Sequence, residues 1–260
     1  MIRTIKCRLL LVALLLGAAD VRAVEAGHSP FEPGKGLKPF PLVEIPASSQ
    51  PKNMDAPQLY EFTDRAEKEK TRVVKIFWPA DGGAASVTLS VNGAKVFSGK
   101  IEGSPLAEPR VWRTDLNGDG IPDYVAITYN GGGCGLAGEL SWVTFLLSSP
   151  TGCTEISVLS FDAEPADVVN IGGRAYLVDA SFVYGEAGKD GRAHNYWVYN
   201  LLRVDGKTLA LDNAADRRFP KWVLYTFAPN HHDTDQLTPE QRERLWRQYL
   251  KDNPWSLGGG

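Results

Sequence analysis

Apolar and polar residues alternate with a period of two along much of the middle of this chain. The alternation is clearest in residues 86–91 and 94–98, which Asn92 and Gly93 separate. An Asn-Gly pair between two such runs predicts a β-hairpin, because a type I′ turn needs positive φ at both central positions. Asp205-Gly206 stands in the same way between residues 195–204 and 207–211 and predicts a second hairpin.

Other runs rich in β-branched and aromatic residues predict further strands. We expect these strands at residues 71–78, 124–129, 140–147, 155–161, 168–170 and 174–178. Within 195–204, Trp197 and Tyr199 share one face and Tyr196 and Val198 the other, so this strand is expected to be covered on both sides. About ten strands in all predict a mainly β fold, either an antiparallel sandwich or a curved meander sheet.

Three segments are expected to be helical. Residues 58–70 predict a short charged helix, and residues 220–227 a helical turn. A third helix is predicted at 238–253, because Thr238 as N-cap, a proline at the first position and Gln241 three residues after the cap are typical of a helix start. An apolar stripe at helical spacing follows, formed by Leu245, Trp246, Tyr249 and Leu250. This stripe predicts docking of the helix onto the sheet in preference to binding of a partner.

Composition places the chain among ordinary globular proteins. It has 260 residues, is 43% hydrophobic and 23% charged, and has a formal net charge of −3. Since there is no surplus or block of Lys and Arg, we do not expect a nucleic-acid partner. Residues 24–58 are rich in Pro and Gly and predict an extended segment that drapes over the domain or is partly disordered. The β-rich domain is then expected at 59–237.

Residues 1–23 have the organisation of a signal peptide. Arg3, Lys6 and Arg8 precede an apolar run at 9–19 that is too short to span a bilayer, and 21–23 offer a cleavage site. An uncleaved membrane anchor is the alternative. We expect a periplasmic or secreted protein that begins near Val24, with no transmembrane segment after cleavage.

Cys134 and Cys153 are the two cysteines left after removal of the predicted signal peptide. An even number in an oxidising compartment favours one disulfide, which should stabilise the fold by roughly 3 kcal/mol. The alternative is two separate buried thiols. Because the pair does not form a C-x-x-C motif, we expect no redox role.

Oxygen-bearing side chains recur at every second residue of the stretch 115–123. Asp115, Asn117 and Asp119 supply side-chain oxygens, Ile121 offers a backbone carbonyl, and Asp123 would bind directly or through a water. Ca²⁺ takes six to eight oxygens, so this spacing predicts a calcium loop. A solvated turn without metal is the alternative.

The residues after this loop exclude an EF-hand. The twelfth position from Asp115 is Ala126, where an EF-hand needs Glu, and a β-rich run follows in place of a helix. The stretch from Asp115 to Tyr129 instead resembles the D-x-N-x-D-G-x-x-D loop of FG-GAP and VCBS repeats. That resemblance implies a Ca²⁺ site between two strands, with Asp115, Asn117, Asp119, Ile121 and Asp123 as ligands. The loop occurs once, so a repeat-built propeller is not expected.

Two further segments are candidate sites. The glycine-rich run 130–139 lacks the Gly-Lys-Ser/Thr of a phosphate loop, so it is a hairpin connection or, as the alternative, a ligand-facing loop. Glu139 would complete the calcium shell if the next strand folded back. His231 and His232 are adjacent in sequence and point apart on most backbones, which favours a surface linker over a metal site.

These features predict an exported calcium-binding protein that acts as a non-catalytic binding or structural module, with an envelope protein or glycan as partner. The alternative is an envelope hydrolase of glycan or peptide whose active-site loop the ion supports. The chain has no G-x-S-x-G or H-E-x-x-H motif, but a carboxylate pair matched only in space is compatible with the sequence. A periplasmic inhibitor or adhesin-like protein is a third possibility, for which an exposed aromatic patch would speak.

Overall fold

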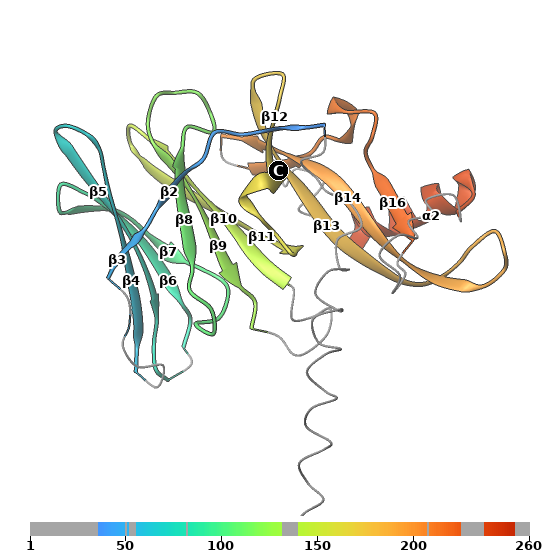
Figure 1. Cartoon of the computed structure of the whole chain (residues 1–260), viewed down its shortest axis with the longest axis horizontal. Coiled ribbons are helices and arrows are strands. Elements are labelled where there is room, and N and C mark those ends of the chain that lie inside the picture. The colour runs from blue at the N-terminus through green and yellow to red at the C-terminus, as the bar shows by residue number, and fades with distance from the viewer. Residues whose placement is uncertain are drawn as a thin grey trace, which may run out of the picture.

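A computed structural model describes residues 36–49, 51, 56–81, 83–131, 140–206, 208–224 and 237–252. These residues form sixteen strands in three antiparallel sheets, with one C-terminal α-helix (Figure 1). The prediction of a mainly β antiparallel fold is therefore confirmed, with more strands than the ten expected. The predicted signal peptide at 1–23 lies outside the described residues and stays a prediction. No helix in the described part is both long and apolar enough to cross a membrane.

The outer sheet has the order β3-β4-β5-β6-β7. Its strands are β3 (Ala47–Ser49), β4 (Gln58–Glu67), β5 (Lys70–Trp78), β6 (Ser86–Val91) and β7 (Ala94–Lys100). The Asn92-Gly93 hairpin joins β6 to β7 as predicted, and both turn residues have positive φ, 51° and 80°.

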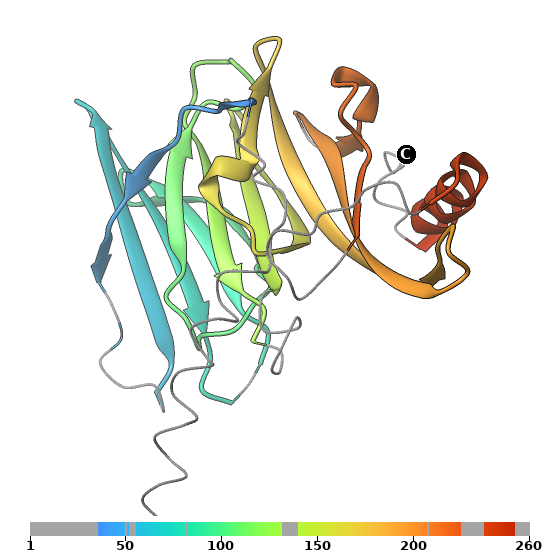
Figure 2. The same ribbon diagram turned by 45° about the vertical axis from the view of Figure 1, so that its right-hand side comes forward.

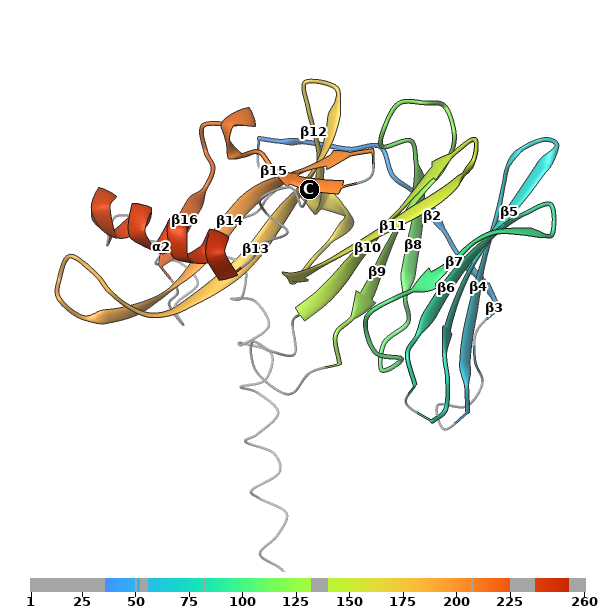
Figure 3. The ribbon, with the colours of Figure 1, turned by 180° about the vertical axis from the view of Figure 1, so that it is seen from behind.

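The central sheet has the order β11-β10-β9-β8-β2 and lies between the other two (Figures 1 and 3). Its strands are β2 (Val43–Ile45), β8 (Arg110–Thr114), β9 (Asp123–Tyr129), β10 (Leu140–Ser149) and β11 (Gly152–Phe161). In β9, Tyr124 and Ala126 pack in the core shared with the outer sheet, while Val125 and Ile127 face the core on the opposite side. Burial on both faces explains the unbroken apolar run of this strand.

The third, curved sheet has six strands, and its long strands β13 and β14 bend strongly (Figure 2). The strands are β1 (Lys38–Pro39), β12 (Val168–Ile171), β13 (Arg174–Ala187), β14 (Ala193–Asp205), β15 (Thr208–Leu211) and β16 (Lys221–Leu224). Two short 3-10 helices accompany it, η2 (Pro165–Asp167) and η3 (Asn213–Ala215). As predicted, β14 is covered on both sides, with Trp197 and Tyr199 in one buried cluster and Tyr196 and Val198 in another.

Residues 36–49 run across all three sheets. β1 pairs with β12, β2 with β8, and β3 with β4, so this extended segment adds one short strand to each sheet. Backbone pairing and side-chain burial both hold this stretch, because Phe40, Ile45 and Leu37 are each buried in a different core cluster. Residues 24–35, 50 and 52–55 of the predicted segment lie outside the described part.

Two predicted helical segments are strands. Residues 58–70, predicted as a charged helix, form β4 and the turn into β5, since Gln58, Tyr60, Phe62 and Asp64 are buried at alternate positions. Alternate burial is the period of a strand, and the charged residues that suggested a helix lie around the turn. Residues 220–227, predicted as a helical turn, contain β16, which pairs with β14; residues 225–227 are not described.

The predicted C-terminal helix is present as α2 (Pro239–Asp252). Its capping box is formed: the Gln241 backbone N–H donates to Thr238 Oγ1 at 3.2 Å, and the Thr238 N–H donates to Gln241 Oε1 at 2.8 Å. Leu245 is buried in a cluster with Tyr196, Val198 and Trp222 of the curved sheet. The helix therefore docks on the sheet, as expected, and Leu245 and Trp246 of its apolar stripe make the contact.

Candidate functional site

The acidic loop 115–122 connects β8 to β9 and is folded around the Asp115 carboxylate. Asp115 Oδ1 accepts the backbone N–H groups of Gly118 and Asp119 at 2.8 and 3.1 Å, and Oδ2 accepts that of Gly120 at 3.0 Å. Gly118 and Gly120 have φ of 74° and 78°. A wrapped loop of this kind needs residues without a Cβ at such positions.

Two further side chains continue the wrap. Asn117 Oδ1 accepts the Asp119 N–H at 2.9 Å, and Asp119 Oδ1 accepts the Ile121 N–H at 2.8 Å. Asn117 Nδ2 also donates to Asp119 Oδ2 at 3.2 Å. Both side chains are exposed, so their oxygens remain accessible from solvent.

Asp123 differs from the other predicted ligands because it is fully buried, at the start of β9. Its Oδ2 accepts the Leu116 N–H at 2.8 Å and its Oδ1 accepts the Ser148 N–H of β10 at 2.7 Å. Burial raises the pKa of Asp123 to about 6; the two backbone N–H groups lower it, and the charges of Asp119 and Asp115 raise it further. Asp123 therefore ties the base of the loop to the neighbouring strand.

The loop supplies the right chemistry for calcium without presenting a finished coordination shell. Its carboxylate, amide and carbonyl oxygens are the hard ligands that Ca²⁺ prefers. Asp115 Oδ2, Asn117 Oδ1 and Asp119 Oδ1 each accept one N–H, which leaves each of them a second lone pair. Among the described residues, no group of three or more His, Cys, Asp or Glu side chains is arranged to hold a metal ion. Calcium binding stays a prediction, and Glu139 lies outside the described residues.

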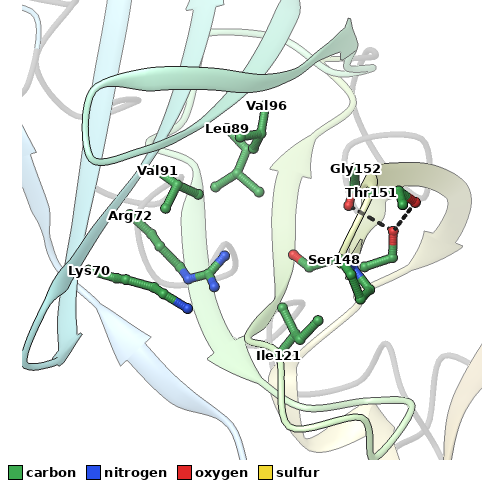
Figure 4. A pocket seen from close by; sticks show the side chains of 11 residues that line it. Lys70, Arg72, Leu89, Val91, Val96, Ile121, Ser148, Thr151 and Gly152 are labelled. Atoms are coloured by element: carbon green, nitrogen blue, oxygen red, sulfur yellow. Dashed lines mark hydrogen bonds between the residues drawn. The ribbon is translucent and has the colours of Figure 1, made fainter.

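A cavity of about 410 Å³ lies beside this loop, between the outer and central sheets. Figure 4 shows side chains from both sheets around it. The lining residues are Lys70, Arg72, Leu89, Val91, Val96, Ile121 and the hairpin residues 148–152, and none of them is acidic. Ile121 and Ser148 belong to the cavity wall, and Ser148 is also the residue to which Asp123 binds. The loop and the cavity therefore share structural elements.

Sequence analysis missed the cavity residues Lys70, Arg72 and Ser148. One signal was present: Arg72 occupies the buried face of β5 in line with Val74, Ile76 and Trp78. A cation at an inward position of an alternating strand is uncommon, because buried charges need partners.

Cys153 carries a free thiol in β11, and burial raises its pKa to about 12. In the β10–β11 ladder, Cys153 lies opposite Ser148. The connection that contains Cys134 begins after Gly131 and ends at Leu140, at the opposite end of β10. The predicted Cys134–Cys153 disulfide is thus not formed at Cys153. Cys134 itself lies outside the described residues, as do 132–139, His231 and His232.

A second buried acidic group, also missed from sequence, lies at η2. Asp167 is 6% exposed, and its Oδ2 accepts the Glu164 N–H at 2.8 Å. Burial raises the pKa of Asp167 to about 7; the Glu164 N–H lowers it, and the charges of Asp162, Glu164 and Asp179 raise it. The order Glu-Pro-Ala-Asp, with Pro at the first helical position and Asp at the third, is the signal that predicts such a turn.

Comparison with models of protein families, with curated proteins and with solved structures found no match to this chain. The likeness to FG-GAP and VCBS repeats thus rests on the acidic loop and the strand that follows it. Function has to be argued from the geometry of the site.

Proposed function

We propose that this protein is an exported, calcium-dependent binding module of the cell envelope, without catalytic activity of its own. In this proposal Ca²⁺ orders the Asp115–Asp123 loop through Asp115, Asn117, Asp119 and the Ile121 carbonyl. The observation that carries the proposal is the link between loop and cavity: Ile121 lines the cavity, and Asp123 holds the backbone of Ser148 in its wall. An ion that orders the loop would therefore also order one side of a ligand cavity.

The lining of the cavity favours binding over hydrolysis. A glycoside hydrolase needs two carboxyl groups facing its substrate, and this cavity presents Lys70 and Arg72 with no acidic residue. The envelope hydrolase is therefore the weaker proposal. Within the described part of the chain, Tyr184 is the one aromatic residue among the exposed large apolar side chains, which gives little support to an adhesin-like aromatic patch.

Thermal unfolding of the chain from Val24 onward tests the role of calcium. After treatment with EDTA, added Ca²⁺ should raise the melting temperature, because a ligand at one hundred times its Kd stabilises by about 2.7 kcal/mol. For a domain of this size that corresponds to roughly 5–10 °C.

The matched variants are Asp119→Ala in the loop and Asp205→Ala, which removes an aspartate before glycine at another turn. The calcium response should vanish in the first variant and persist in the second. A wild-type protein that melts at the same temperature with and without Ca²⁺ would overturn the proposal, as would an undiminished response in Asp119→Ala.

A further inference from the structure

Arg72 is a buried cation whose guanidinium makes no hydrogen bond to any residue that the structure describes. The residue is 7% exposed, and its Nε is shielded from solvent without a partner. Its one ion pair is long, with Nη2 3.6 Å from Glu67 Oε1. A buried donor left unpaired is destabilising, so such a group calls for a ligand or another explanation.

Ser148 faces Arg72 across the cavity with a second unpaired group. It is 3% exposed, and its Oγ is buried without a partner within the described part of the chain. Figure 4 shows Lys70 and Arg72 extending from β5 toward Ser148 on β10. Lys70 lies 3.7 Å from Glu67, again beyond a hydrogen bond.

The two cations that line the cavity share one carboxylate, that of Glu67. Asp64 is already engaged, since Arg113 Nη1 and the Tyr124 hydroxyl both donate to it at 3.1 Å. Glu67 is thus the one carboxylate paired with both Lys70 and Arg72. Lys70 and Arg72 are the charged residues among those that line the cavity, so its wall presents positive charge to a ligand.

We propose that this cavity binds the carboxylate or phosphate group of a small organic ligand such as an acidic sugar. Arg72 offers two parallel N–H groups to two anion oxygens, Lys70 adds a point charge, and the Ser148 hydroxyl donates from the opposite wall. An apolar wall beside these groups takes the body of the ligand; it is formed by Leu89, Val91, Val96 and Ile121. The volume of about 410 Å³ lies within the range of small-molecule sites.

This inference names the ligand class of the binding module and rests on the proposed function only for its biological role. Its polar residues Lys70, Arg72 and Ser148 are not among the predicted calcium ligands. The two proposals can therefore fail separately.

Titration calorimetry with the chain from Val24 onward is the direct test. The probes are glucuronate and glucose 6-phosphate, with inorganic phosphate as the free anion and glucose as the neutral control. We expect saturable binding of at least one sugar anion and none of glucose. Inorganic phosphate binding as tightly as glucose 6-phosphate would overturn the part assigned to the apolar wall.

Variants test whether the anion binds in the cavity or to positive charge elsewhere on the surface. Arg72→Gln should weaken anion binding by at least about tenfold, because a charged bidentate pair is lost. Arg174→Gln, which removes an exposed arginine on the curved sheet, should leave binding unchanged. Ser148→Ala and Lys70→Gln should each weaken binding and provide independent tests if Arg72→Gln does not fold.

Melting temperature distinguishes a ligand site from a structural role. Since Arg72 and Ser148 make no side-chain hydrogen bonds to lose, Arg72→Gln and Ser148→Ala should melt no lower than the wild type in the absence of ligand. A wild type that binds none of the anions, or an Arg72→Gln variant that binds them equally well, would refute the inference. Anion binding in EDTA without a calcium response would uphold this inference and sink the calcium proposal, and the opposite pattern would do the reverse.

Discussion

Replacing Asp167 with asparagine should stabilise this protein at neutral pH and leave its stability near pH 4 almost unchanged. In the folded chain, burial raises the pKa of Asp167 from 3.8 to about 7. The native state therefore keeps a proton that the unfolded chain releases, so stability falls as the pH rises from about 4 to about 7. Three pKa units at 1.36 kcal/mol each make a loss of about 4 kcal/mol by pH 8.

Asparagine removes this loss without breaking the local turn. Its side-chain oxygen still accepts the Glu164 N–H that Asp167 accepts now. Its amide is neutral, so it is not repelled by the negative charges of Asp162, Glu164 and Asp179 that raise the pKa of the carboxyl group. Both changes favour the folded state when the carboxyl group would be ionised.

Urea unfolding near pH 4 and pH 8 measures the effect. The control is Asp81→Asn, because Asp81 also accepts one backbone N–H, that of Gly83, but is exposed. The free energy of unfolding of Asp81→Asn should differ from that of the wild type by less than about 0.5 kcal/mol at either pH. If Asp167→Asn is no more stable than the wild type at pH 8, or gains equally near pH 4, the assignment of a buried, protonated Asp167 is wrong.

Two further predictions concern packing and capping. Phe145→Ala should lower the free energy of unfolding, measured in urea, by about 3–5 kcal/mol, because Phe145 is fully buried between the central and curved sheets. The control Leu106→Ala, at a residue that is 67% exposed, should change it by less than about 0.5 kcal/mol. Thr238→Ala should lower the free energy of unfolding in urea by about 1 kcal/mol, because the helix cap is lost. Thr238→Ser keeps the hydroxyl and should be as stable as the wild type. Equal stability of the two variants would contradict a role for the hydroxyl.

The candidate site was predictable only in part. The fold of the acidic loop could be predicted from its residue spacing, because the backbone N–H groups of Gly118 to Gly120 that donate to the Asp115 carboxylate are close to it in sequence. The cavity was not predictable in the same way. Arg72 and Ser148 lie on different sheets, and their meeting depends on how the outer sheet packs on the central one.

The sequence by itself determined the local structure: the Asn92-Gly93 hairpin, the capping box of α2 and most of the long strands. Each of these depends on turn chemistry and on the alternation of nearby side chains. Tertiary structure decided which polar groups were withdrawn from water. Nothing in the local sequence marks Asp123 or Asp167 as buried, yet β10 buries the first and the packing around η2 buries the second. Burial depends on surfaces that segments distant in the chain bring together, and for that reason the raised pKa values and the cavity emerged only from the fold.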